Sequence, residues 1–206
     1  MRQIAFLFLF LLLIACHRTA FKEKWLQEKS PQKFAAKFET SKGNFEVSFT
    51  REWSPLAVDK VYAQIKHGFY NRTLFYRVNP KYAQFGADDS LRIQFWSKNK
   101  IPDEPALQPN ERGTICFARG GKDSRDHNLF FNIVSNSPRL DTIFYNGVRG
   151  FPVIGKVTNG MSVIDSLYNG YDDSVFSKYN TLLSNKKAFL EIYPKLDSII
   201  RLSIIL

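Results

Sequence analysis

The most informative part of the sequence for predicting the fold is the stretch Leu74-Phe75-Tyr76-Arg77-Val78-Asn79-Pro80. Its apolar and aromatic residues are typical of a strand, and the Asn-Pro pair closes it with residues that favour a turn. Arg77 is the charged residue within this run. The strand alone leaves two interpretations of Arg77 open, an ordinary surface arginine or a functional side chain.

Upstream of this strand, the sequence predicts a hairpin and a helix. Residues 37–49 alternate between polar and apolar side chains on both sides of 42–43, which is the pattern of two strands joined by a tight turn. Ser54 then favours an N-cap, with Pro55 at the first helical position. Apolar residues follow at helical spacing, and Gly68 ends the predicted helix.

Downstream, short strands alternate with loops and a few helices. Residues 87–112 are polar, contain three prolines and predict a long irregular loop, which in a compact domain is usually functional. Many short strands with few helices indicate a mainly β domain, a closed or nearly closed β-barrel with helical plugs. The further strands are expected at 113–118, 129–134, 151–157 and 199–206, and the helices at 161–168 and 184–192.

The N-terminus has the pattern of a targeting signal. An unbroken apolar run over 4–14 is too short to span a bilayer, which takes about 20 residues, and it matches a secretory signal. Residues 13–16, Leu-Ile-Ala-Cys, resemble the lipobox of bacterial lipoproteins, in which cleavage leaves a lipidated cysteine, here Cys16, at the new N-terminus. An ordinary signal peptide that happens to contain a cysteine is the alternative.

This interpretation divides the chain into a signal peptide (1–15), a lipidated cysteine with a polar tether that has room for one helical turn (16–34) and a folded domain (35–206). It places the protein in the bacterial cell envelope, lipid-anchored on the periplasmic side of a membrane. Because His17 rather than aspartate follows the cysteine, the resemblance to lipoproteins favours the outer membrane.

Composition excludes several classes of protein. Hydrophobic residues make up 44% of the chain, so a core can form and the chain is not disordered. The net charge is +10, but the basic residues are scattered, so we expect no nucleic-acid partner and instead an attraction to anionic lipid head groups. Cys16 and Cys116 lie in different settings and form no spaced cluster with the three histidines; we expect no disulfide, no metal and no cofactor.

Motifs in a fixed order across residues 37–168 resemble the cyclophilins. The stretch 74–80 is similar to the Phe-His-Arg-Val-x-Pro strand of that family. The resemblance implies an eight-stranded antiparallel barrel capped by two helices, here with an extra C-terminal helix, and a substrate groove on one outer face of the barrel. The other similar segments follow in family order at 38–43, 54–55, 68–70, 112–118, 129–131, 140–141, 154–157 and 160–165.

The activity that this resemblance implies is cis–trans isomerisation of the peptide bond before proline. Amide resonance makes the rotational barrier about 18–20 kcal/mol. A twisted amide nitrogen regains its lone pair and can accept a hydrogen bond, and a guanidinium is suited to donate one because it is rigid and always charged. Arg77 lies where the family has its catalytic arginine and is the expected catalytic residue.

The resemblance also places the substrate-binding residues. Ala118 and Arg119 fall where the groove backbone pairs with the substrate, and Asn128 takes the place of a groove glutamine. Apolar walls are expected around the proline ring, although plain core packing is the alternative for aromatic residues at strand spacing. By motif position, these walls are Tyr82, Phe130, Leu140 and Phe151, the last standing where the family usually has a histidine.

The stretch Ala83-Gln84-Phe85-Gly86 departs from the Met-x-Gln-Gly-Gly that the family often has here. The glutamine is displaced by one position, and neighbouring residues of a strand face opposite sides. Either Phe85 replaces the glutamine in the groove, or the local backbone shifts to bring Gln84 into it. The Gln-Phe-Gly run resembles a divergent bacterial branch of cyclophilins.

Two classes of function follow from the resemblance. The first is an isomerase that acts on X–Pro bonds of envelope proteins and aids their folding. The second is a peptide-binding module or chaperone that kept the groove and lost turnover, which the changes at Phe85, Asn128, Arg139 and Phe151 motivate. In both cases the expected partners are proline-containing polypeptides and the membrane, and the protein is expected to be a monomer. Arg139 replaces a tryptophan of the family, which predicts poor binding of cyclosporin.

Overall fold

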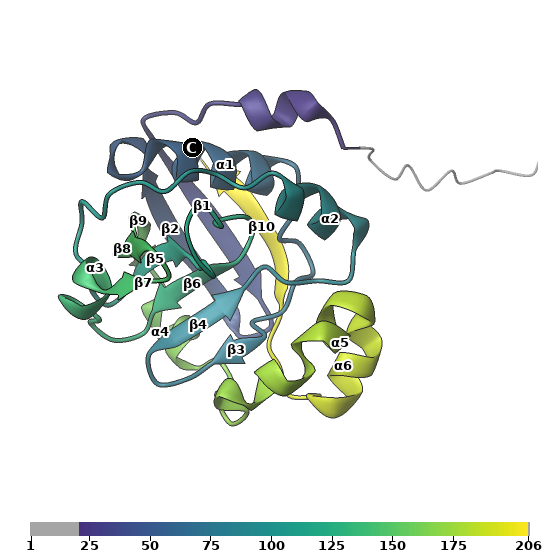
Figure 1. The fold of residues 1–206 in the computed structure, drawn as a ribbon. Helices are drawn as coiled ribbons and strands as arrows, with labels where there is room; N and C mark the ends of the chain where they lie inside the picture. Colours follow the sequence, from purple (N-terminus) through teal and green to yellow (C-terminus); the bar gives the residue numbers. More distant parts are fainter. Residues whose placement is uncertain (1–20, 206) are drawn as a thin grey trace, which may run out of the picture.

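The computed structural model describes residues 21–205, and its scaffold is one antiparallel sheet of eight strands (Figure 1). The mainly β fold class is therefore confirmed, and β1 and β2 form the hairpin that the alternation on both sides of Gly43 predicts. In spatial order the strands are β10 (Ile199–Ile205), β1 (Lys33–Thr40), β2 (Gly43–Thr50), β9 (Val153–Asn159), β5 (Thr114–Phe117), β6 (Leu129–Asn132), β4 (Tyr82–Phe85) and β3 (Arg77–Val78).

The sheet curls, but the expected closed barrel is not confirmed. β3 and β10 are the two edge strands and are not paired with each other. Near them, Leu74 and Ser198 form an isolated bridge, and the backbone N–H of Ile199 donates to the carbonyl of Thr73 at 2.8 Å. Asn79 and Pro80 end β3 after two residues, so the strand is too short to pair along β10.

Phenylalanines fill the inside of the curled sheet. Phe38 stacks on Phe45 with ring centroids 4.5 Å apart, and Phe85 stacks on Phe131 at 5.7 Å; all of these rings are buried. Because side chains alternate across a strand, their neighbours on β4 and β6 face the outside of the sheet. This outer face is where the groove described below lies.

Two helices pack against the sheet, as expected. α1 (Pro55–Lys66) lies across one end of the sheet (Figure 1), and the short α4 (Met161–Asp165) packs beside β2. α1 begins at Pro55 as predicted, but the side chain of Ser54 does not cap it. The Glu104 carboxylate does so instead, since it accepts hydrogen bonds from the backbone N–H groups of Leu56 at 2.7 Å and Ala57 at 3.2 Å.

The long segment 87–112 is not irregular throughout, because it contains the helix α2 (Leu91–Lys98). The sequence does not predict this helix, because only half of its residues are apolar and these form no clear stripe. Tertiary packing stabilises it: Trp96 is buried, and its ring lies edge-on to Phe69 at 6.3 Å. A single large anchor residue is a weak sequence signal for a helix.

The C-terminal part of the chain forms a small helical subassembly beside β3. The predicted helix at 184–192 corresponds to α6 (Lys186–Ile192), and two helical segments that were not predicted precede it, the 3-10 helix η3 (Asp172–Lys178) and α5 (Tyr179–Ser184). Figure 1 shows α5 and α6 in yellow-green next to the β3 end of the sheet. They enclose a second, smaller core made of Leu74, Tyr76, Ala87, Val175, Leu182, Phe189 and Tyr193.

Residues 21–27, the first that the structure describes, pack against the domain. In the 3-10 helix η1 (Glu23–Gln27), Trp25 is buried and stacks on His67 at 3.9 Å, and Phe21 stacks on Phe95 at 4.7 Å. Residues 21–34, which the sequence suggested as part of a tether, are therefore in contact with the domain. The predicted signal peptide and Cys16 lie outside the described residues.

The remaining elements are a short 3-10 helix, one helical turn and two short strands. The segment 142–150 forms a small hairpin directly after a single helical turn. Within residues 21–205, no helix is both long and apolar enough to cross a membrane. The elements are η2 (Arg51–Trp53), α3 (Arg139–Thr142), β7 (Phe144–Tyr145) and β8 (Val148–Arg149).

Candidate active site

An open groove of about 570 Å³ lies along the outer side of β3, β4 and β6. Its lining brings together residues that are up to 103 positions apart in the sequence, from Tyr76 before β3 to Tyr179 in the C-terminal helices. The predicted site residues that line it are Arg77, Tyr82, Gln84, Ala118, Arg119, Asn128, Phe130, Leu140 and Phe151.

Strand β4 decides between the two alternatives that the sequence left open for Gln84 and Phe85. Gln84 is paired with Arg77 on one side and with Phe130 on the other, and it points into the groove. Phe85 faces the core and is fully buried, with its ring 5.4 Å from Phe75. The prediction that Phe85 lines the groove is therefore wrong, because adjacent residues of a strand face opposite sides.

Gly86 explains why the strand can turn away directly after Phe85. Its φ of 110° lies in a region that other residues rarely adopt. A Cβ atom at this position would collide with the backbone carbonyl oxygen of His127. The close approach of these two backbones holds β4 against the loop that leads into β6.

The Arg77 guanidinium is held from several sides. Nη1 donates a hydrogen bond to Oε1 of Gln84 at 3.1 Å, and Nε donates to Oδ1 of Asp173 at 2.6 Å. Its Cζ lies 5.5 Å from the centroid of the Tyr82 ring and 4.9 Å from that of Phe176. The side chain is 19% exposed, so the group stands at the groove surface with little freedom to move.

An apolar pocket lies beside Arg77. The Phe130 ring meets Tyr82 at 5.3 Å and Phe151 at 5.8 Å, both edge-to-face. Leu140 and Cys116 pack with them in a cluster that is separate from the barrel core. Because this cluster is on the outer face of the sheet, it forms the floor and walls of a pocket that opens into the groove. Such a socket suits a small apolar ring.

Asn128 is tied to two tyrosines rather than standing free in the groove. Its Oδ1 accepts a hydrogen bond from the hydroxyl of Tyr76 at 3.1 Å, and its Nδ2 donates to the hydroxyl of Tyr179 at 3.4 Å. Burial raises the pKa of both phenols, so they are neutral at ordinary pH. The amide thus links β6 to the helical subassembly.

The Arg119 side chain has a structural role in addition to the backbone role predicted for this residue. Ala118 lines the groove beside it, but the Arg119 side chain is buried and donates to backbone carbonyls of the rim hairpin, among them Tyr145 at 3.0 Å and Gly150 at 2.6 Å. Its guanidinium also lies over the Phe151 ring at 4.4 Å. Arg119 therefore fixes the rim and the pocket wall, which its motif position alone did not indicate.

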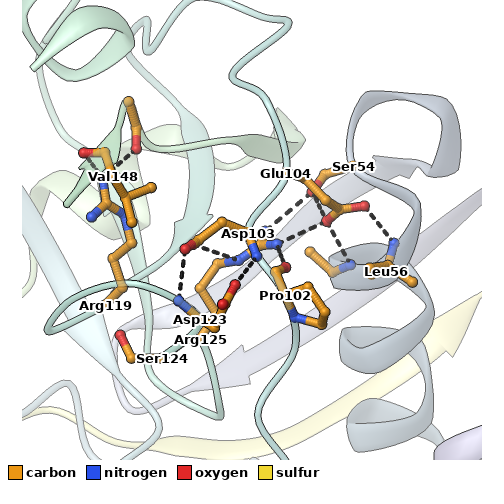
Figure 2. A network of polar contacts seen from close by, with 12 residues as sticks. Ser54, Leu56, Pro102, Asp103, Glu104, Arg119, Asp123, Ser124, Arg125 and Val148 are labelled. Carbon is orange, nitrogen blue, oxygen red and sulfur yellow. Dashed lines mark hydrogen bonds and ion pairs between the residues drawn. The ribbon is translucent and has the colours of Figure 1, made fainter. Parts of the chain in front are cut away.

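A buried polar network lies beside Arg119 and Ser124, two residues of the groove lining (Figure 2). The Arg125 guanidinium, 1% exposed, pairs with Glu104 at 3.1 Å, and the same carboxylate caps α1. Asp103 and Asp123 exchange backbone-to-carboxylate hydrogen bonds of 2.8 and 2.7 Å. The network ties the loop that includes Ser124 to α1; no sequence motif predicted it.

The helical subassembly supplies a groove wall that the sequence did not predict. Phe176 of η3 and Tyr179 of α5 line the groove, and Asp173 contacts Arg77. The recognised motifs end at residue 168, so nothing in the sequence pattern connected these residues with the site. Burial of Val175 and Leu182 in the second core is what brings them there.

Comparisons with known proteins agree with this geometry. The family model described as cyclophilin type peptidyl-prolyl cis-trans isomerase/CLD matches residues 35–185. A peptidyl-prolyl cis-trans isomerase of Acinetobacter baylyi is 31% identical over 136 residues, which is 63% of this chain and 69% of the relative. Peptidyl-prolyl cis-trans isomerase A of Dickeya dadantii is 34% identical over 137 residues, which is 62% of this chain and 67% of the relative.

A solved structure shows the same fold. The cyclophilin type peptidyl-prolyl cis-trans isomerase of Cryptosporidium parvum superposes with a TM-score of 0.57 at 18% identity, covering 84% of this chain and 98% of that structure. The family model spans the groove and both of its sides, from the first hairpin to α5. The chain therefore belongs to the cyclophilin-type peptidyl-prolyl cis-trans isomerases.

Proposed function

We propose that this protein isomerises X–Pro bonds of proteins in a bacterial cell envelope, with Arg77 as the catalytic residue. One observation carries the proposal: the Arg77 guanidinium and an apolar socket share one open groove. The related Cryptosporidium parvum cyclophilin was crystallised in the presence of the dipeptide Ala-Pro, which supports a proline-containing peptide as substrate here too.

The mechanism follows from the chemistry of the amide. The proline ring packs against Phe130, Tyr82 and Leu140, which holds one side of the bond while the other side rotates. As planarity is lost, the nitrogen regains its lone pair and Arg77 donates a hydrogen bond to it. Because the lone pair is localised only in the twisted state, this bond stabilises the transition state more than either ground state.

Gln84 assists by holding the guanidinium. Its Oε1 accepts from Nη1 of Arg77 at 3.1 Å, and the register places both residues side by side on β3 and β4. The reaction needs no bond making to the enzyme, so orientation and electrostatics carry the catalysis.

The test is the substitution Arg77→Ala, assayed by NMR exchange on a short Ala-Pro peptide. We expect kcat/KM to fall about 10²–10³-fold, as for loss of one preorganised donor. Arg201→Ala, which removes an exposed arginine of β10, serves as the control and should leave the rate unchanged. Unaltered turnover in Arg77→Ala contradicts the proposal.

The same assay decides between the enzyme and the binding module. Peptide binding without measurable turnover in the wild type would favour the module. The chain keeps an arginine and an apolar pocket together, whereas a binding module needs only the pocket. This difference is why we favour the enzyme.

We also propose that Cys16 is lipidated and that the protein is held at the periplasmic side of the outer membrane. The support is the sequence of residues 1–17, with its apolar run and the Leu-Ile-Ala-Cys motif. In a bacterial host, Cys16→Ser should abolish incorporation of a labelled fatty acid, and the variant should leave the membrane fraction. Labelling that persists in Cys16→Ser would contradict lipidation at this residue.

A further inference from the structure

The helical subassembly contributes a carboxylate directly to the catalytic arginine. Asp173 Oδ1 accepts from Nε of Arg77 at 2.6 Å and from Nδ2 of Asn79 at 3.0 Å. Asn79 in turn accepts from the backbone N–H groups of Lys81 and Tyr82, each at 2.9 Å. The carboxylate is thus bonded both to β3 itself and to the turn that leads from β3 to β4.

Asp173 is held in place by the element that carries it. Val175, two residues further along η3, is buried in the second core. Phe176 follows and places its ring 4.9 Å from the Arg77 guanidinium. The segment therefore presents a charged group and an aromatic face to the same arginine, although it lies 96 positions away in the sequence.

Two of the three nitrogen atoms of the Arg77 guanidinium form hydrogen bonds within the protein. Nε is engaged by Asp173 and Nη1 by Gln84. Among residues 21–205, Nη2 of Arg77 forms no hydrogen bond, so its N–H groups remain for a substrate. Two fixed bonds determine the plane of a guanidinium, because the group is rigid and planar.

We propose that Asp173 is a positioning residue of the isomerase, which orients the Arg77 guanidinium so that Nη2 meets the twisting amide nitrogen. This inference rests on the proposed function, since it assumes that Arg77 is catalytic. The hydrogen bond from Arg77 also lowers the pKa of Asp173, so the carboxylate is ionised at neutral pH. An ionised acceptor makes a stronger bond to the guanidinium than a neutral one.

The experiment compares Asp173→Ala and Asp173→Asn with the wild type. We expect kcat for the Ala-Pro peptide to fall about tenfold in Asp173→Ala with KM changed less than about twofold, because the loss concerns the transition state. Asp173→Asn keeps an oxygen that can accept from Nε and should recover most of the rate. In NMR spectra, the Arg77 Nε–H resonance of the wild type should be protected from exchange and lose that protection in Asp173→Ala.

The chain offers a matched control. Asp165 accepts from Nη2 of Arg112 at 2.6 Å and is exposed, as Asp173 is, and neither residue of this pair lines the groove. Asp165→Ala should leave kcat and KM unchanged. Melting temperatures of all variants should stay within about 2 °C of the wild type, since exposed ion pairs contribute little to stability.

The outcomes separate this inference from the proposed function. If Arg77→Ala abolishes turnover but Asp173→Ala keeps the full rate, the positioning role is wrong and the proposed function stands. A faster Asp173→Ala overturns the inference as well, since the carboxylate would then restrain the arginine. Loss of rate in Asp173→Asn equal to that in Asp173→Ala also overturns it. If Arg77→Ala leaves turnover intact, the proposed function itself fails.

Discussion

The two faces of β4 and β6 carry similar aromatic residues in different surroundings. On the inner face, Phe85 and Phe131 stack on each other and are fully buried. On the outer face, Tyr82 and Phe130 meet edge-to-face beside Arg77 and line a groove. The comparison indicates that inner-face residues stabilise the fold, whereas outer-face residues form the groove in which we propose the reaction, although the two sets alternate along the same strands.

The largest effect should come from the inner face. Phe85→Ala removes a fully buried ring and should lower the free energy of unfolding by about 3–5 kcal/mol, because a cavity is left in a packed core. Denaturant unfolding measures this. The remaining folded protein should keep kcat/KM within about threefold of wild type. Phe144→Ala, which truncates a side chain that is 74% exposed, is the control and should change stability by less than about 0.5 kcal/mol.

If kcat/KM of the folded Phe85→Ala protein fell by more than about threefold, the comparison would fail, because a core residue would then affect the reaction.

Acid should lower the free energy of unfolding by protonating Asp59, a residue that does not line the groove. Burial alone would raise the pKa of Asp59 on α1, but hydrogen bonds from Arg51 and Ser30 outweigh it and hold the pKa at about 2. Because the pKa is 3.8 in the unfolded chain, the stabilisation is complete above pH 4 and is lost as the pH falls towards 2. The loss should be about 2 kcal/mol.

Unfolding of wild type and Asp59→Asn at pH 6 and pH 2.5 measures this contribution. The variant should be less stable at pH 6 and should lose less stability on acidification than the wild type. Equal acid sensitivity in both proteins would show that other carboxylates determine it.

The smallest effect should come from Gln84 on the outer face. Gln84→Ala removes the acceptor for Nη1 of Arg77 and should lower kcat/KM about tenfold, with the free energy of unfolding changed by about 1 kcal/mol or less. Gln94→Ala on α2, which truncates an exposed glutamine, is the control for rate and stability. An unchanged rate in Gln84→Ala would show that Asp173 and Phe176 suffice to hold Arg77.

Sequence motifs predicted the sheet, α1 and most of the groove because these depend on local patterns. Alternation predicted the hairpin around Gly43, and Ser54-Pro55 predicted the start of α1. The motif comparison could not choose between Gln84 and Phe85, since a shift of one position changes the face of every following side chain. The paired register with Arg77 and Phe130 decides it.

The rest of the site depends on packing between distant segments. Asp173 reaches Arg77 because Val175 and Leu182 bury themselves beside Tyr76, and no local pattern encodes that contact. The closed barrel was expected from the family, but the two-residue β3 leaves the edge strands unpaired. Whether Cys16 carries a lipid remains a prediction from residues 1–17.

Phe21 stacks on Phe95 and Trp25 on His67, so the chain is attached to the domain from residue 21 onwards. This attachment affects how the groove would lie relative to a membrane. Under the proposed lipidation, residues 17–20 are the only spacer, and a fully stretched chain from Cys16 to Phe21 reaches roughly 17 Å. The α1 side of the molecule would then rest near the lipid head groups. In Figure 1, the purple N-terminal helix η1 and β3 lie at opposite ends of the view, so the groove along β3 would lie away from the membrane and within reach of passing polypeptides.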